Sequence, residues 1–90
     1  MEKKLENLRK QIDAIDKDLL NSLAKRTLTV QKIGKFKKAQ GKALRDDKRW
    51  QQLLEGILTR AESLNLSKDF INKIYTLIHK YSLDIERKSE

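Results

Sequence analysis

Two cationic side chains, Arg26 and Lys37, interrupt a stripe of apolar residues that repeats at helical spacing through Val30 and Ile33. They are eleven residues apart in the sequence, which is about three helical turns, so they project from nearly the same line of a helix. Either side chain alone could extend past the apolar stripe to water or pair with a carboxylate on another helix. Two cations in line, with apolar residues between them, favour an anion-binding site.

Other polar residues interrupt apolar stripes in the same way. Arg49 begins a stripe of its own, and Ser82 and Glu86 lie one helical turn apart beside an apolar face. Taken alone, Ser82 and Glu86 are equally consistent with a solvated flank. His79 belongs to the same series, but no second metal-type ligand stands at a suitable spacing. We therefore expect His79 to be an edge residue of the core or a solvated residue.

One interior pocket could receive the polar side chains of all three segments, namely Arg26, Lys37, Arg49, Ser82 and Glu86. Such a pocket would be strongly positive, and because unpaired buried cations are costly, an anionic ligand is expected to complete it. The sequence offers no activated nucleophile, no metal-ligand set and no glycine-rich phosphate loop. A small dicarboxylate held by arginines in fork geometry fits best.

The apolar spacing predicts an all-α fold, a single domain over residues 1–90 with helices at about 3–39, 46–63 and 67–88. Asp46 and Ser67 are good N-cap residues for the two shorter helices. Gly41 is the expected break after the long helix, whereas Gly34 stands inside that helix at a tolerable cost.

The long helix would measure on the order of 50 Å, while the two shorter helices would span only about 30 Å each. The shorter helices would therefore leave part of its apolar stripe uncovered. We expect a symmetric, intertwined homodimer in which the long helices pair. A plain coiled coil is disfavoured, because the period lasts for too few heptads and the shorter helices would have no role.

Composition excludes several other classes. The chain has no cysteine and one histidine, which argues against disulfides, thiolate chemistry and zinc. The N-terminal MEKKLENLRK has no apolar core of a signal peptide, and no run is long enough for a membrane span, so a cytoplasmic protein is expected. The net charge of +8 permits nucleic-acid binding, but no aromatic residues interleave with the lysines to stack bases.

The run LRKQIDAIDKDLLNSLAKRTLTVQKIGKFK, the segment RDDKR after the break and the Ser82 to Glu86 pair resemble the all-helical chorismate mutases of the AroQ class. The likeness covers nearly the whole chain. It implies a dimer of three-helix subunits with intertwined long helices and two active sites. It also implies a cofactor-free rearrangement of chorismate to prephenate, in the shikimate pathway to phenylalanine and tyrosine.

The resemblance assigns roles to individual residues. Arg26 of one chain and Arg9 of the other would grip the two substrate carboxylates, with Ser82 assisting. Asp46 and Arg49 complete the implied substrate-binding set. Lys37 and Glu86 would be catalytic, near the ether oxygen on which negative charge grows.

Two positions depart from the family pattern. Many members carry glutamine where this chain has Glu86, and a glutamate can donate a hydrogen bond only when protonated. We therefore expect activity to fall as pH rises and Glu86→Gln to restore it at neutral pH. The best-known members carry, at the position of Trp50, a glutamate that accepts the substrate's ring hydroxyl, whereas an indole only donates. Hydroxyl recognition would then fall to backbone, water or Gln51, or the hydroxyl would be bound loosely.

Three alternatives stay open at this point. A lyase that removes pyruvate from isochorismate shares the fold and many pocket residues. A basic helical dimer could bind nucleic acid instead. The chain could also be a regulatory or truncated domain whose natural partner is a larger synthase. Some family branches that accompany another shikimate-pathway enzyme carry tryptophan at the position of Trp50, which is therefore interpreted as a variant.

Overall fold

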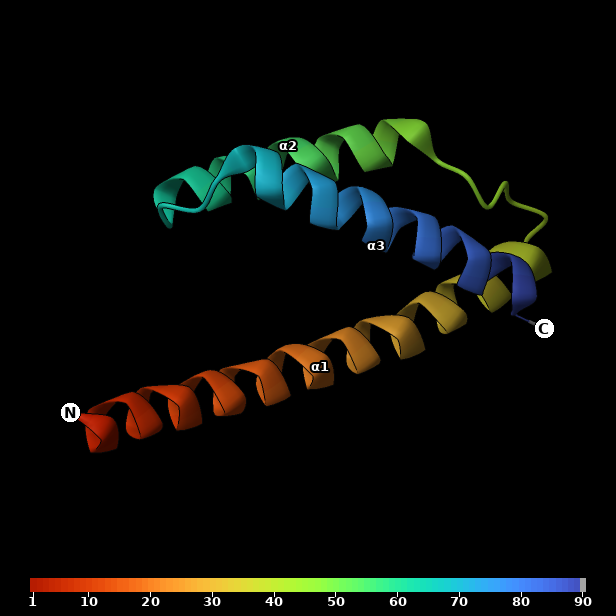
Figure 1. Cartoon of the computed structure of the whole chain (residues 1–90). Helices are drawn as coiled ribbons and strands as arrows, with labels where there is room; N and C mark the ends of the chain where they lie inside the picture. The colour runs from red at the N-terminus through yellow and green to blue at the C-terminus, as the bar shows by residue number, and fades with distance from the viewer. Residues whose placement is uncertain (90) are drawn as a thin grey trace.

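The computed structural model describes residues 1–89 and consists of three α-helices, α1 (Glu2–Ala39), α2 (Asp47–Ser63) and α3 (Lys68–Lys88) (Figure 1). No strand occurs in these residues. The prediction of an all-helical chain with one long and two shorter helices is confirmed. Each helix ends at the residue expected from the sequence, and each helix start differs from the expected one by a single residue.

Local chemistry explains where the helices begin and end. The Asp46 carboxylate accepts a hydrogen bond from the Arg49 amide at 3.0 Å, and the Ser67 hydroxyl accepts one from the Phe70 amide at 3.2 Å. Each bond satisfies a backbone donor that has no partner within the helix. Gly41 follows α1 with φ of 66°, a left-handed conformation that glycine adopts without steric cost. The break predicted at Gly41 is therefore confirmed.

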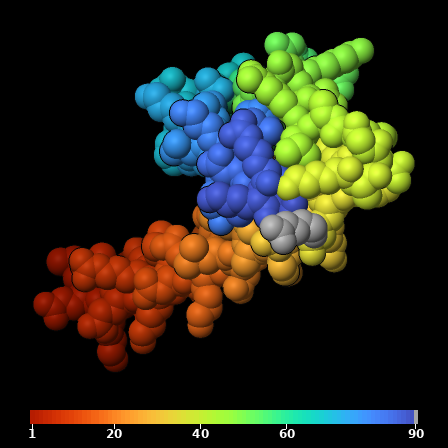
Figure 2. All heavy atoms as spheres, turned by 90° about the vertical axis from the view of Figure 1, so that its right-hand side faces the viewer, coloured from red at the N-terminus to blue at the C-terminus, as the bar shows by residue number. Residues whose placement is uncertain are grey.

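The helix α3 lies between the other two and packs against both of them (Figure 1). Only the C-terminal half of α1 contacts α3, because the two helices diverge towards the N-terminus of α1. Figure 2 shows this N-terminal half projecting from the rest of the molecule. The molecule is accordingly elongated, with extents of 59 × 27 × 15 Å.

The core of the single chain is thin. Among residues 1–89 the apolar side chains that are buried are Val30 and Ala61. The apolar stripe on the projecting half of α1 is 47–57% exposed and consists of Leu5, Leu8, Ile12, Ile15 and Leu19. The prediction that two shorter helices leave part of the long helix uncovered is confirmed. None of the helices in residues 1–89 combines the length and the hydropathy needed to cross a membrane.

Gly34 marks the closest approach of α1 to α3. A Cβ atom at Gly34 would lie 2.9 Å from the Glu86 Cα and 3.0 Å from the Glu86 carbonyl oxygen. Both are backbone atoms that cannot move without shifting the helix. Gly34 is therefore more than a tolerated glycine, since its missing side chain lets α3 bring Glu86 against α1.

The C-terminal end of α3 is fastened to α1 close to this contact. Lys38 Nζ donates to the carbonyl oxygens of Arg87, at 2.6 Å, and of Ser89. Cations near a helix C-terminus satisfy carbonyl groups that have no partner in the helix. Lys38 therefore holds together the ends of the two helices that carry Lys37 and Glu86.

Candidate active site

Six of the seven residues expected in the site surround one cavity of about 320 Å³: Arg26, Lys37, Asp46, Arg49, Ser82 and Glu86. Larger hollows occur on this elongated chain. This cavity differs from them because all three helices line it. Apolar side chains such as Val30, Ile33 and Leu53 complete its walls.

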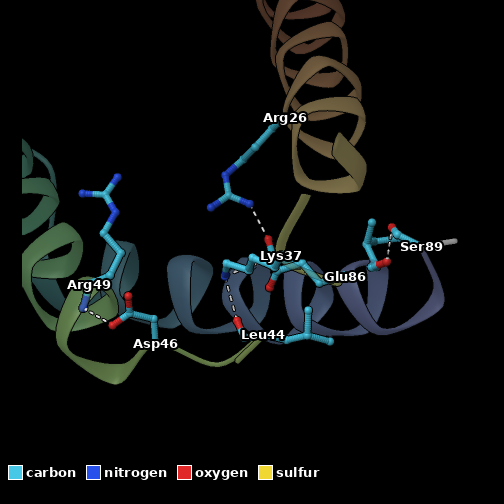
Figure 3. A network of polar contacts seen from close by, with 9 residues as sticks. Arg26, Lys37, Leu44, Asp46, Arg49, Glu86 and Ser89 are labelled. Carbon is cyan, nitrogen blue, oxygen red and sulfur yellow. Dashed lines mark hydrogen bonds and ion pairs between the residues drawn. The ribbon is translucent and has the colours of Figure 1, made fainter. Parts of the chain in front are cut away.

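Each helix contributes to the cavity. Arg26 and Lys37 come from the same face of α1, as their three-turn spacing predicts, and the first turn of α2 contributes Arg49. Ser82 and Glu86 come from the buried side of α3 rather than from a solvated flank. Figure 3 shows these side chains and their polar contacts.

Arg26 is held by a hydroxyl of α3. Its Nη1 donates to Ser82 Oγ, and that hydroxyl in turn donates to the Ile78 carbonyl oxygen at 2.8 Å. A guanidinium has five N–H donors in a planar fork. Ser82 therefore orients Arg26, and most N–H donors of the guanidinium stay available for a carboxylate.

Lys37 forms an ion pair across the α1–α3 contact. Its Nζ lies 2.8 Å from Glu86 Oε1 and also donates to the Leu44 carbonyl oxygen at 2.8 Å. The side chains are only 23% and 8% exposed, so the pair is largely desolvated. From the sequence, Lys37 could either reach past the apolar stripe to water or pair with a carboxylate on another helix. The structure shows the second arrangement. Of the three ammonium donors, one is left for a ligand.

The first turn of α2 brings Asp46 and Arg49 to the opposite side of the cavity. Asp46 caps the helix by accepting from the Arg49 amide, and it thereby fixes where α2 begins. The Arg49 side chain extends from this turn and lines the cavity from an exposed position (Figure 3). Arg26 and Arg49 are therefore two arginine forks on different helices that face one cavity.

An aromatic pair forms a further part of the wall. The rings of Trp50 and His79 are stacked, with centroids 4.0 Å apart and planes 8° from parallel. Both residues line the cavity and are half-buried. The sequence predicts His79 at the edge of the core or in solvent, because no second metal ligand stands at a suitable spacing. Its position one turn before Ser82 is the signal in the sequence that indicates a place in the site.

Burial lowers the pKa of His79, and the positive charge of Arg45 lowers it further. Arg26 acts in the same direction, whereas the carboxylates of Asp47 and Glu86 oppose the shift. Burial outweighs them because it disfavours the charged imidazolium. His79 is therefore held in its neutral form near pH 7.

Arg9 lies apart from the other expected site residues. It is exposed on the projecting half of α1 and does not line the cavity. At the rise of a helix it stands roughly 25 Å along α1 from Arg26. A single chain therefore does not bring Arg9 to this site.

The geometry supports binding of a small anion with two carboxylates. Three cations and two carboxylates face the cavity, and two of the charges already neutralise each other in the Lys37–Glu86 pair. Within residues 1–89 no three His, Asp or Glu side chains gather in a way that could hold a metal ion. The expected substrate class, a dicarboxylate, is compatible with these charges.

Comparison with known proteins places the chain in a family. The family described as "Chorismate mutase type II" matches residues 8–87. A bifunctional chorismate mutase/prephenate dehydratase of Enterobacter agglomerans is 34% identical over 71 residues, which are 79% of this chain and 18% of that protein. The protein of that name in Escherichia coli strain K12 shows the same identity and coverage.

A bifunctional chorismate mutase/prephenate dehydratase of Buchnera aphidicola from Acyrthosiphon pisum is 30% identical over 80 residues. That match covers 89% of this chain and 21% of the relative, so the chain spans about a fifth of the length of the curated relatives it matches. The family match extends over nearly all of the three helices that build the cavity. The chain therefore belongs to the chorismate mutase type II family.

Proposed function

We propose that the protein is a chorismate mutase, which isomerises chorismate to prephenate, and that the three helices form one chorismate mutase domain. The observation that carries the proposal is the convergence of Arg26, Lys37 and Arg49 on one cavity. Membership of the chorismate mutase type II family supports it independently. The reaction is an intramolecular rearrangement, so it needs a shaped and charged cavity rather than a nucleophile.

Binding the two substrate carboxylates is the first task of the site. Arg26, oriented by Ser82, binds one carboxylate through its remaining donors. Arg49 contributes a second positive charge from α2. Holding chorismate in the compact conformer in which the reacting carbons meet removes much of the entropic part of the barrier.

Stabilising the breaking ether bond is the second task. Negative charge develops on the ether oxygen in the transition state, and a fixed donor there lowers the barrier more than it strengthens ground-state binding. Lys37 supplies this donor through the N–H that its contacts with Glu86 and Leu44 leave available. A protonated Glu86 supplies a second donor.

A homodimer would complete the site. The exposed apolar stripe of α1 supports this, because a second copy could cover it. A hollow of about 440 Å³ between α2 and α3 offers a matching apolar surface with Leu53, Ile57 and Ile71 in its lining. In such an intertwined dimer, Arg9 of one subunit reaches the cavity of its partner and binds the second carboxylate.

Association with another shikimate-pathway enzyme is a further part of the proposal. The relatives named above are described as bifunctional, with prephenate dehydratase as their second activity. The present chain spans only about a fifth of their length. We therefore expect the mutase to operate beside an enzyme that makes chorismate or consumes prephenate.

The test is consumption of chorismate by the purified protein, followed by its absorbance, with prephenate identified as the product. Arg26→Ala should lower kcat/KM by roughly 100-fold or more, because it removes a charge-assisted contact to the substrate. Lys25→Ala is the matched control, since it removes a neighbouring exposed charge outside the cavity. Helical circular dichroism should be the same for both variants.

Isochorismate is tested in parallel, with release of pyruvate as the readout. Faster turnover of isochorismate than of chorismate would make the protein a lyase. No consumption of chorismate at either acidic or neutral pH would overturn the proposed function.

A further inference from the structure

We propose that His79 accepts a hydrogen bond from the ring hydroxyl of chorismate and so determines selectivity for the hydroxylated substrate. The proposal rests on the proposed function. The imidazole on α3 would accept the hydrogen bond of the ring hydroxyl. Trp50 cannot accept it, because its indole nitrogen only donates.

The cavity offers few other acceptors for a hydroxyl proton. Ser82 Oγ already accepts from Arg26 and uses its own proton on Ile78. Asp46 Oδ1 accepts from the backbone as a helix cap. Glu86 Oε1 is bound by the ammonium of Lys37. Each of these oxygens therefore already has a partner, and Asp46 Oδ2 and Glu86 Oε2 are the side-chain acceptors that compete with the imidazole of His79.

The imidazole of His79 has an acceptor that is not engaged in this way. Among the hydrogen bonds of side chains within residues 1–89, none involves the imidazole of His79. A neutral imidazole carries one acceptor nitrogen, and an imidazolium carries none. Burial beside the arginines keeps the ring neutral, so the acceptor is present at pH 7.

Stacking fixes the direction of this acceptor. Trp50 covers one face of the imidazole at 4.0 Å, so the ring nitrogens lie at the edge of a plane that is held in place. A ring that is already immobilised loses little rotational freedom when it binds a ligand. In this arrangement Trp50 is a positioning residue and His79 is the residue that touches the substrate.

The expected kinetic signature follows from the chemistry of the reaction. The ring hydroxyl gains no charge during the rearrangement, so its hydrogen bond is equally strong in the ground state and the transition state. Loss of such uniform binding raises KM and leaves kcat unchanged. A purely structural role of His79 would instead lower kcat or the amount of folded protein.

The experiment measures kcat and KM for chorismate and for an analogue in which the ring hydroxyl is replaced by hydrogen. The wild-type enzyme should prefer chorismate by about tenfold in kcat/KM, the size expected of one neutral hydrogen bond. His79→Phe keeps a ring that can stack on Trp50 but has no acceptor. This variant should raise KM for chorismate by about tenfold, keep kcat within about twofold and abolish the preference.

Two further variants sharpen the comparison. His79→Gln restores an acceptor oxygen and should recover part of the preference. Gln51→Ala tests the competing acceptor that the sequence suggests. Gln51 is exposed and does not line the cavity, so this variant should leave the preference unchanged. Loss of the preference in Gln51→Ala would transfer the role to Gln51.

The two proposals fail in different ways. An enzyme that converts chorismate but keeps its preference in His79→Phe would overturn the role of His79 and leave the mutase function intact. A wild-type enzyme with no preference for the hydroxylated substrate would also overturn that role, whether or not His79→Phe folds. Absence of any turnover of chorismate would overturn the mutase function itself.

Discussion

At the scale of single residues, the expected role of Glu86 conflicts with its observed contact. It is expected to donate to the ether oxygen, yet it accepts from Lys37 in a largely desolvated ion pair. An ionised Glu86 facing the ether oxygen would repel the charge that develops there, whereas a protonated Glu86 would donate to it. An amide at this position, which donates without first taking up a proton, should therefore serve the proposed reaction better than a carboxylate that pairs with Lys37.

The first prediction concerns Glu86→Gln. We expect Glu86→Gln to raise kcat/KM at pH 8 by roughly tenfold or more. Its amide donates to the ether oxygen, whereas the carboxylate that pairs with Lys37 can only accept. Initial rates of chorismate consumption by the two proteins measure the difference.

The matched control for Glu86→Gln is Glu55→Gln, an exposed carboxylate on α2 that does not line the cavity. It should retain the wild-type kcat/KM. No gain in Glu86→Gln at pH 8 would contradict the donor role assigned to this position.

The second prediction concerns the pKa of His79. This is the only histidine of the chain, so one imidazole resonance reports its titration in proton NMR. We expect a midpoint below the ordinary value of about 6.5, because burial and then Arg45 lower the pKa. Trp50→Ala should move the midpoint upwards, since it exposes the imidazole to water. A midpoint at or above the ordinary value would contradict the desolvated environment.

The same shift links folding to pH. A lowered pKa in the folded state means that the unfolded state binds the proton more tightly. The stabilisation is therefore fully present above the ordinary histidine pKa and is lost as pH falls through the lower pKa of the folded state. His79→Phe should remove this contribution to the pH dependence of unfolding.

At the scale of elements, the helices could be predicted because their signals are local. The period of the apolar residues, the caps Asp46 and Ser67, and the break at Gly41 all act within a few residues. The common line of Arg26 and Lys37 also follows from helical geometry alone.

The contacts between elements could not be predicted in the same way. The Lys37–Glu86 pair and the Trp50–His79 stack each depend on how far one helix is shifted along another. Sequence spacing within one helix carries no information on that shift. A helical glycine often marks a close approach of two backbones, so Gly34 is the sequence feature that indicates the α1–α3 contact.

The third prediction is that Gly34→Ala forces α1 and α3 apart. The added Cβ would meet two backbone atoms of Glu86 at 2.9 and 3.0 Å, so the helices must shift rather than a side chain. We expect a loss of about 1–3 kcal/mol in the free energy of unfolding, measured with urea, and a lower kcat. The fall in kcat follows because the shift displaces Glu86 from Lys37.

Asn72→Ala on α3 is the control for helix propensity. Asn72 is exposed and lies outside the hollow proposed to receive the second copy, so alanine should leave stability unchanged or raise it by up to about 1 kcal/mol. Equal effects of the two substitutions would show that helix propensity, rather than the α1–α3 contact, sets the importance of Gly34.

At the scale of the whole molecule, the single chain leaves two features unexplained. The projecting half of α1 exposes a continuous apolar stripe, and Arg9 on the same half does not reach the cavity of its own chain. A second copy accounts for both, because it can cover the stripe and receive Arg9 in its own site. The dimer proposal therefore predicts that each site takes Arg26 from one chain and Arg9 from the other.

Mixing two inactive variants tests that claim. Arg9→Ala and Arg26→Ala should each lower kcat/KM by roughly 100-fold while leaving a dimer of twice 10.6 kDa in sedimentation. Unfolded together at equal amounts and refolded, half of the dimers are hybrids. In a hybrid, one site combines the intact Arg26 of one chain with the intact Arg9 of the other.

The refolded mixture should therefore recover about a quarter of wild-type activity, since one site in two is intact in half of the dimers. Each variant refolded alone is the control and should recover none. If Arg9 acted within its own chain, every site of the hybrid would lack one arginine and mixing would restore nothing. Activity of the mixture thus separates a site shared between subunits from one that a single chain completes by bending α1.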